Sequence, residues 1–520
     1  MAESLRLHAA PGKQVDATVI QPLTAALLAR NATRNLIALG VPLIVALATL
    51  PVLVSRLGTT HFGLLGLVWV FFGLFAELGL GKATTKYAAE AFADADGGSA
   101  RGVLRLGVLL QLALGIVLGI ALAAGADPLA AQIAGTAGVV GETRAVLYVV
   151  AASLPVVMVS AAYRGVVEAA HRFDLVNRVR IPLTVSTYLL PAILVLTGSG
   201  LVSITIALAA ARVLGTLCYA ALAWRVVREY DAARAAVAER PVTRAMMSFG
   251  AWQTASGLLA PLLACMDRFM LGGIAGVAAV GLYTPAFEIA SRLLILPAGV
   301  VTALFPAFSA WSAAEAARSA RTAARAVLYI SAALAPIVVV VIGLGADGLA
   351  LWLGAVFARE TATALAILAM GALLNAAAYV PATLLQGAGR PDIPTKLYLV
   401  ELPLYMMLMV VLITRWGVIG AAAAWSIRVA VDAMLLFSVT HITGLLPMRE
   451  LVDSRVPQTL LGLAALALAP AAAAAGLEPS WLRLVVTGAA AAVAVAFLWT
   501  YSLRAEGRAR IAEALGFATT

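Results

Sequence analysis

Three arginines stand near the middle of long apolar runs, where a charged side chain is costly. They are Arg212, Arg292 and Arg428. Membrane-insertion experiments give the lowest estimates of this cost, and even they assign about 2.5–3.5 kcal/mol to an arginine at the centre of a transmembrane helix. Such residues therefore face protein or a water-filled cavity. A guanidinium group holds phosphate through forked, charge-assisted hydrogen bonds. These residues therefore predict a binding site for an anion. Among substrates that are moved across a membrane, a phosphate attached to a lipid is the plausible anion.

Two acids accompany these arginines at helical spacing. Glu288 precedes Arg292 by four residues, and Asp432 follows Arg428 by four. Residues four apart share one helix face, so each pair is expected to form an ion pair, and both acids join the candidate substrate-binding residues. The alternative is that the pairs are purely structural. Arg212 has no acid four residues away on either side, which favours a binding role for it.

A further charged pair, Asp267 and Arg268, lies toward the end of the apolar run 247–271. This position predicts the last helical turn before the outer surface, where a charge is less costly than at the centre. We expect the pair to close the outer end of a cleft through ion pairs or to be structural. Direct contact with the substrate is the alternative.

Enzyme and metal motifs are missing from the sequence. It has no GxxxxGK[ST], HExxH or GxSxG pattern, and its two cysteines show no metal-ligand or disulfide spacing. We therefore predict no catalytic residues, no metal site, no cofactor and no enzymatic activity. Coupling to a proton or a sodium ion stays open.

The composition indicates a polytopic membrane protein that is all-α. Hydrophobic residues make up 62% of the 520 residues and charged ones 12%, with a mean hydropathy of +0.98. A membrane helix needs about 20 apolar residues. On this measure we predict about fourteen transmembrane helices.

Basic residues are distributed unequally between the predicted loops. Of the 36 lysines and arginines, 27 fall on the side of the amino terminus, five on the other side and four within spans. Because short cytoplasmic loops collect lysine and arginine, both termini are predicted to be cytoplasmic. The high net charge is thus explained by topology, and no nucleic-acid partner is expected.

The two halves of the chain show weak self-similarity. Thr197-Gly-Ser-Gly-Leu precedes Arg212, and Thr414-Arg-Trp-Gly-Val precedes Arg428 at nearly the same distance. Such a parallel repeat predicts two pseudo-symmetric six-helix lobes facing each other across a cleft, with two additional C-terminal helices. The predicted organisation is a cytoplasmic tail (1–34), an N-lobe (35–223), a cytoplasmic linker (224–246), a C-lobe (247–440), two further spans with their preceding loop (441–501) and a second cytoplasmic tail (502–520).

Three stretches are similar to a known family. Residues 55–91, beginning SRLGTTHFGLLG, and residues 266–310, beginning MDRFMLGG, resemble the hairpins of the polysaccharide-unit (Wzx-type, O-antigen/oligosaccharide) flippases. LLQGAGRPDIPTK, at residues 384–396, resembles the loop that follows their tenth span. These flippases belong to the multidrug/oligosaccharidyl-lipid/polysaccharide exporter superfamily.

The resemblance implies a carrier in the bacterial inner membrane that moves an undecaprenyl-diphosphate-linked glycan to the outer leaflet by alternating access. Its partners would be that glycan, membrane lipids and, as candidates, a polysaccharide polymerase and export machinery. The family's cationic central cavity is similar to what Arg212, Arg292 and Arg428 would form.

Two alternatives within the superfamily remain. A lipid II-type flippase resembles the chain at Arg292, ahead of Pro297, but Ile295 stands where that branch has an acid. A drug or organic-cation antiporter would need a buried acid in the N-lobe, whereas Glu77 lies near the predicted cytoplasmic end of its span.

Overall fold

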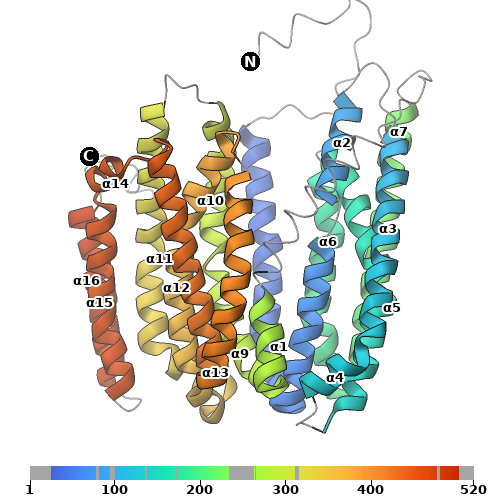
Figure 1. Cartoon of the computed structure of the whole chain (residues 1–520), viewed down its shortest axis with the longest axis horizontal. Helices are drawn as coiled ribbons and strands as arrows, with labels where there is room; N and C mark the ends of the chain where they lie inside the picture. Colours follow the sequence, from blue (N-terminus) through green and yellow to red (C-terminus); the bar gives the residue numbers. More distant parts are fainter. Residues whose placement is uncertain are drawn as a thin grey trace, which may run out of the picture.

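The computed structural model shows an all-helical bundle (Figure 1). It describes residues 25–77, 81–93, 100–134, 138–170, 172–232, 263, 265–310, 316–390, 392–476 and 481–502. Within these residues, ten helices are long and apolar enough to cross a membrane. Most of predicted span seven, 247–271, lies outside the described residues.

Two helices are far longer than a membrane is thick. Helix α1 (Ala25–Glu77) has 53 residues and α13 (Asp392–Ile442) has 51. At about 1.5 Å per residue, each would span roughly two and a half times the hydrocarbon core of about 30 Å. The backbone leaves helical geometry at Gly58 in α1, with φ 69°, and at Gly417 in α13, with φ 51°. Each helix therefore folds back at its glycine, and we call the two arms the limbs of a helical hairpin (Figure 1).

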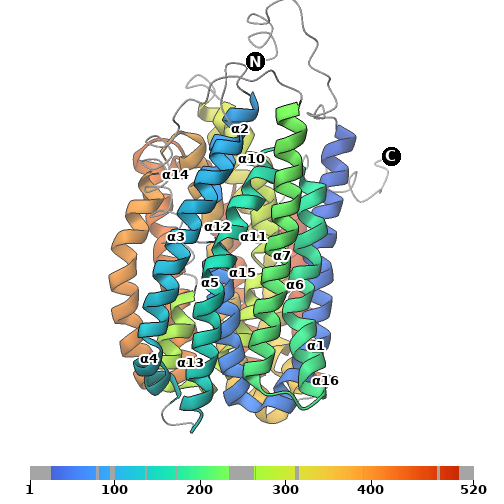
Figure 2. The same ribbon diagram turned by 90° about the vertical axis from the view of Figure 1, so that its right-hand side faces the viewer.

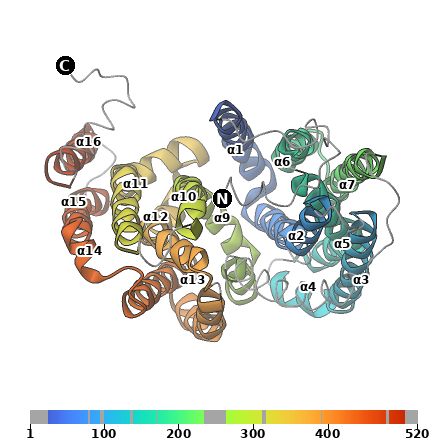
Figure 3. The same cartoon turned by 90° about the horizontal axis from the view of Figure 1, so that it is seen from above.

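The helices form two groups that lie beside each other when the bundle is viewed along its axis (Figure 3). In the amino-terminal group, α3, α5, α7 and α6 stand side by side in that order (Figure 2). This group comprises α1, α2 (Gly81–Ala93), α3 (Ala100–Ala124), α4 (Ala126–Ala134), α5 (Val140–Ala169), α6 (Phe173–Leu196) and α7 (Leu201–Ala232). The carboxy-terminal group comprises the helical residues 265–275, α9 (Val277–Arg292), α10 (Ile295–Ala310), α11 (Ala316–Leu353), α12 (Ala355–Gly387) and α13.

Three further helices follow the carboxy-terminal group and pack on α11. They are α14 (Met448–Asp453), α15 (Val456–Gly476) and α16 (Trp481–Phe497), which runs into a π-helical turn (Leu498–Ser502). The Nη1 atom of buried Arg483 in α16 lies 3.1 Å from each carboxylate oxygen of Asp347 in α11. This charge-assisted contact links α16 to the bundle.

Glycines mark the turns at one end of the bundle, the lower end in Figure 1. The left-handed backbone needed for a tight turn has no steric cost at glycine. Among the described residues, each group has three such glycines in the turns at this end: Gly58, Gly138 and Gly198 in the first, and Gly276, Gly354 and Gly417 in the second. The same turn device thus recurs in both halves of the chain.

The two groups touch closely near this end, between the second limb of α1 and α9. A Cβ atom built on Gly63 would lie 1.8 Å from the carbonyl oxygen of Val277, and one on Gly281 would lie 2.1 Å from that of Thr59. Only glycine fits at either position. The two groups are therefore in direct backbone contact here, as small residues permit in membrane proteins.

Candidate functional site

Arg292 lies at a break in the helix that sequence alone presents as one span. Helix α9 ends at Arg292 and α10 begins at Ile295, with Leu293 and Leu294 in a turn. Pro297 contributes to this break because it has no N–H to donate to the preceding turn. The carbonyl groups that end a helix carry partial negative charge, which favours a cation at this position. Irregular backbone at membrane depth is tolerated where protein or a watery cavity surrounds it.

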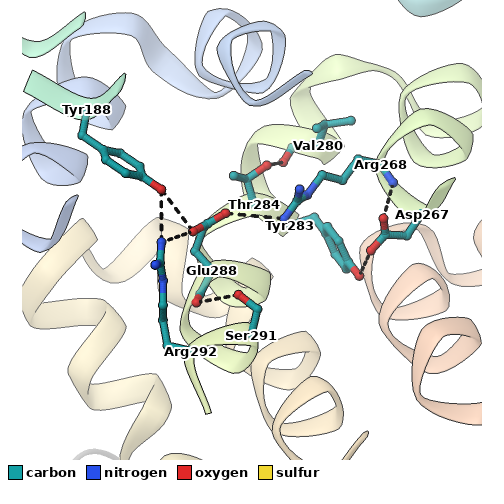
Figure 4. Close-up of polar contacts among 9 residues, drawn as sticks. All are labelled: Tyr188, Asp267, Arg268, Val280, Tyr283, Thr284, Glu288, Ser291 and Arg292. Carbon is teal, nitrogen blue, oxygen red and sulfur yellow. Dashed lines mark hydrogen bonds and ion pairs between the residues drawn. The ribbon is translucent and has the colours of Figure 1, made fainter. Parts of the chain in front are cut away.

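Arg292 joins the two helix groups through two acceptors (Figure 4). Its Nη2 atom lies 2.8 Å from Oε2 of Glu288, the partner expected from the spacing, and donates a 3.1 Å hydrogen bond to the hydroxyl of Tyr188. That hydroxyl in turn donates to Oε2 of Glu288 at 3.4 Å. Tyr188 comes from α6 and the other two residues from α9, so the contact crosses between groups.

Arg268 approaches the same carboxylate from the other side. Its Nη2 atom lies 3.6 Å from Oε1 of Glu288, and its guanidinium carbon lies 4.4 Å from the ring centre of Phe287. Its Nε has no hydrogen-bond partner among the described residues. We call Tyr188, Arg268, Glu288 and Arg292 the central cluster, in which two guanidinium groups share one carboxylate.

Asp267 is fully buried and does not pair with the guanidinium of Arg268. Its carboxylate accepts a 2.6 Å hydrogen bond from the hydroxyl of Tyr283 and a 2.8 Å bond from the backbone N–H of Arg268. The helix also continues to residue 275, one turn beyond the predicted end at Leu271. Arg268 consequently lies about two helical turns before Gly276 rather than in the last turn of its helix.

Arg212 has no ion pair within the described residues, as its spacing suggested. Its guanidinium carbon lies 5.3 Å from the ring centre of Phe72, a contact between α7 and α1. Arg212 also lies near Tyr188. It therefore stands beside the central cluster as a cation whose electrostatic partner is an aromatic face rather than an acid.

Arg428 differs from the prediction in its partner. Its Nη1 atom lies 3.4 Å from Oε2 of Glu401, not within ion-pair distance of Asp432, so the expected Arg428–Asp432 pair is wrong. Glu401 and Arg428 stand on opposite limbs of the α13 hairpin, which a search for residues four apart does not reach. The signal available in the sequence was an isolated acid in an apolar run. Asp432 is buried, and its Oδ1 has no partner among the described residues.

The charged residues form two regions with opposite excess charge. Around the central cluster, three arginines, Arg212, Arg268 and Arg292, outnumber two acids, Glu288 and the adjacent Asp267, so positive charge remains in excess. Positive charge in excess attracts an anion. Around Arg428, two acids face one arginine. The described residues contain no group of three or more side chains suited to hold a metal ion.

Solved structures show which class of protein has this fold. A multidrug resistance MATE family transporter of the MOP superfamily, in its inward-facing conformation, superposes with a TM-score of 0.64 at 19% identity, over 79% of this chain and 98% of that one. The lipid II flippase MurJ, in an inward closed conformation, superposes with a TM-score of 0.65 at 12% identity, over 90% and 99%. The chain is thus a multi-pass membrane protein with the fold of the MOP superfamily of transporters.

The family itself is identified by sequence. The pattern of the polysaccharide biosynthesis protein family matches residues 28–312, more than half of the chain, and the chain belongs to this family. A Shigella flexneri protein assigned to O-antigen transport is 30% identical over 190 residues, which cover 36% of this chain and 44% of that protein. The family is one of polysaccharide biosynthesis, and the chain spans less than half the length of the curated relative that it matches.

Proposed function

We propose that the protein translocates a lipid-diphosphate-linked oligosaccharide, the repeat unit of a polysaccharide, across the bacterial inner membrane. The observation that carries this proposal is the excess of guanidinium groups where the two helix groups meet. Arg212 and the two arginines of the central cluster offer donors that suit a diphosphate, whose negative charges need several partners. Relief of their mutual repulsion would add to the affinity for such an anion.

Alternating access is the mechanism that we infer. The backbone contact of Gly63 with Val277 joins the two helix groups at one end of the bundle, which supports a conformation closed at that end. The central cluster holds the groups together by a few polar contacts, which are readily exchanged for contacts to a bound phosphate. Cargo would enter from the opposite, cytoplasmic end, and closure around it would open the glycine contact.

We further propose fourteen spans, in two six-helix lobes at 35–223 and 247–440 and two spans in 441–501. The cytoplasmic parts would be the linker 224–246 and the tails 1–34 and 502–520. Division of α1 and α13 into two limbs each supports this count, because each hairpin then supplies two spans. The glycine turns at one end and the accumulation of basic residues in loops of the other support the orientation.

The excess positive charge argues against an organic cation as cargo. The same positive charge suits any lipid diphosphate, including lipid II. An experiment must therefore decide which glycan carrier is transported. Purified protein is reconstituted into liposomes with undecaprenyl-diphosphate-linked oligosaccharide or with lipid II, and appearance of sugar on the outer surface is followed with an impermeant lectin. We expect transport of the oligosaccharide carrier.

A double variant of the two predicted arginines at this junction, R212A/R292A, is the decisive comparison. It should lose transport while its abundance stays near normal. Arg228→Ala, an exposed arginine of α7, is the matched control and should transport normally. Undiminished transport by the double variant would refute the cationic site, and transport of lipid II alone would replace the proposed cargo.

A further inference from the structure

A polar pocket of about 280 Å³ lies in the carboxy-terminal group, between α12 and the two limbs of α13. It is separate from the central cluster. Its polar lining side chains include Asn375, Tyr379, Gln386, Tyr398, Arg428 and Asp432. Because these residues interrupt otherwise apolar helices, their grouping around one cavity needs an explanation beyond packing.

The pocket lies along one face of α12, toward the end of the helix that is away from Gly354. Asn375 and Tyr379 are four residues apart, and Gln386 follows seven residues later, so all three lie on one helix face. This stretch is the part of α12 away from the turn at Gly354. It therefore lies on the predicted cytoplasmic side, from which a newly made cargo would arrive.

Most of the polar groups in this pocket are unoccupied. Within the described residues, the amides of Asn375 and Gln386 and the hydroxyls of Tyr379 and Tyr398 have no protein hydrogen-bond partner. Asp432 is 5% exposed, and its Oδ1 is likewise without a partner in this part of the chain. Polar groups at membrane depth that lack protein partners are costly unless water or a ligand satisfies them.

The charge balance selects the kind of ligand. Arg428 and Asp432 cancel each other within the lining, and nearby Glu401 adds negative charge, so a phosphate is disfavoured. Amides and phenol hydroxyls both donate and accept hydrogen bonds. A group with many hydroxyls and no charge matches that mixture, and tyrosine rings can cover its apolar faces.

The pocket volume limits the size of the ligand. Pockets for small molecules range from about 300 to 1,000 Å³, so this one is at the small end of that range. A single sugar ring is of suitable size, whereas an oligosaccharide is not. We propose that this pocket binds one monosaccharide unit of the cargo, apart from the arginines that hold its phosphates. This inference rests on the proposed function and specifies how the glycan is recognised.

The test compares carriers with and without a sugar. Binding to the purified full-length protein in nanodiscs is measured for undecaprenyl diphosphate and for the same lipid bearing glucose, galactose, N-acetylglucosamine or N-acetylgalactosamine. We expect at least one glycosylated carrier to bind about tenfold more tightly than undecaprenyl diphosphate. The variant N375A/Q386A should lose that preference while its affinity for undecaprenyl diphosphate is unchanged.

Two further variants show whether a loss of preference arises from the pocket itself rather than from misfolding or a non-specific effect. Tyr379→Phe removes only a hydroxyl and should reduce the sugar preference by a smaller factor. Gln458→Ala, an exposed amide at the start of α15, is the matched control and should keep the full preference. The sugar pocket is refuted if no glycosylated carrier is preferred, or if N375A/Q386A keeps the wild-type preference. If none of the five lipids binds, the proposed function fails as well, which separates the two outcomes.

Discussion

The hydroxyl of Tyr188 and the guanidinium of Arg292 are hydrogen-bonded at 3.1 Å although they stand 104 residues apart, in different helix groups. Both also contact Oε2 of Glu288, so the three side chains form a closed triangle between α6 and α9 (Figure 4). A polar triangle of this kind holds two bodies together only as long as no stronger partner competes for the arginine. An anion that binds at this triangle would therefore change the contacts of both helix groups at the same time.

Removing the hydroxyl in Tyr188→Phe should loosen the junction between the groups. The hydroxyl makes two hydrogen bonds, one from Arg292 and one to Glu288, and losing even one of them, worth about 0.5–1.5 kcal/mol, changes a conformational equilibrium by roughly 2–10-fold. Distances between spin labels placed on the two groups would report the change as a redistribution between conformers. Tyr148→Phe, at an exposed tyrosine of α5, is the matched control and should leave the distribution as in the wild type. An unchanged distribution in Tyr188→Phe would show that the hydrogen bonds of this hydroxyl do not couple the groups.

Arg292→Lys should test whether geometry matters in addition to charge. Lysine keeps the positive charge but cannot form the forked pair of hydrogen bonds that suits a phosphate. We expect transport by reconstituted protein to fall about tenfold in Arg292→Lys and to disappear in Arg292→Ala. Arg228→Lys should transport normally. Full transport by Arg292→Lys would mean that a point charge is sufficient.

Gly63→Ala should prevent closure of the glycine contact. The new Cβ would overlap the carbonyl oxygen of Val277, so α1 and α9 must separate at this end. A cysteine introduced at Thr59 should then react faster with an impermeant thiol reagent added from outside. Gly73→Ala lies on the same limb of α1 with open space around it and serves as control. Equal labelling rates in the two variants would contradict the prediction.

Glu401→Ala should destabilise the protein because Arg428 is left buried without its partner. Breaking a buried ion pair costs about 3–5 kcal/mol, whereas replacing both members by apolar residues is often neutral. We expect a clear fall in Tm for Glu401→Ala and substantial recovery in E401A/R428M, measured by thermal unfolding in detergent. If the double variant is no more stable than the single one, the pair is not what stabilises this hairpin.

The sequence by itself predicts the features that depend on short stretches of chain. Apolar runs indicate an all-helical membrane protein, and loop charges indicate its orientation. The pairing of Glu288 with Arg292 follows from their spacing on one helix, and the structure contains it. The glycines at the turns near Thr197 and Thr414 are also visible as an internal repeat. Each of these depends on helical periodicity or composition, which are local properties.

Only the tertiary structure decides which helix faces meet. Arg428 binds Glu401 across a hairpin instead of its neighbour Asp432, and Arg268 reaches Glu288 from the other arm of its own hairpin. Tyr188 joins them from the other half of the chain. A helix can present any face to its neighbour, and its rotation and depth are set by packing over its whole length. A single charged residue therefore does not reveal its partner until the helices are assembled.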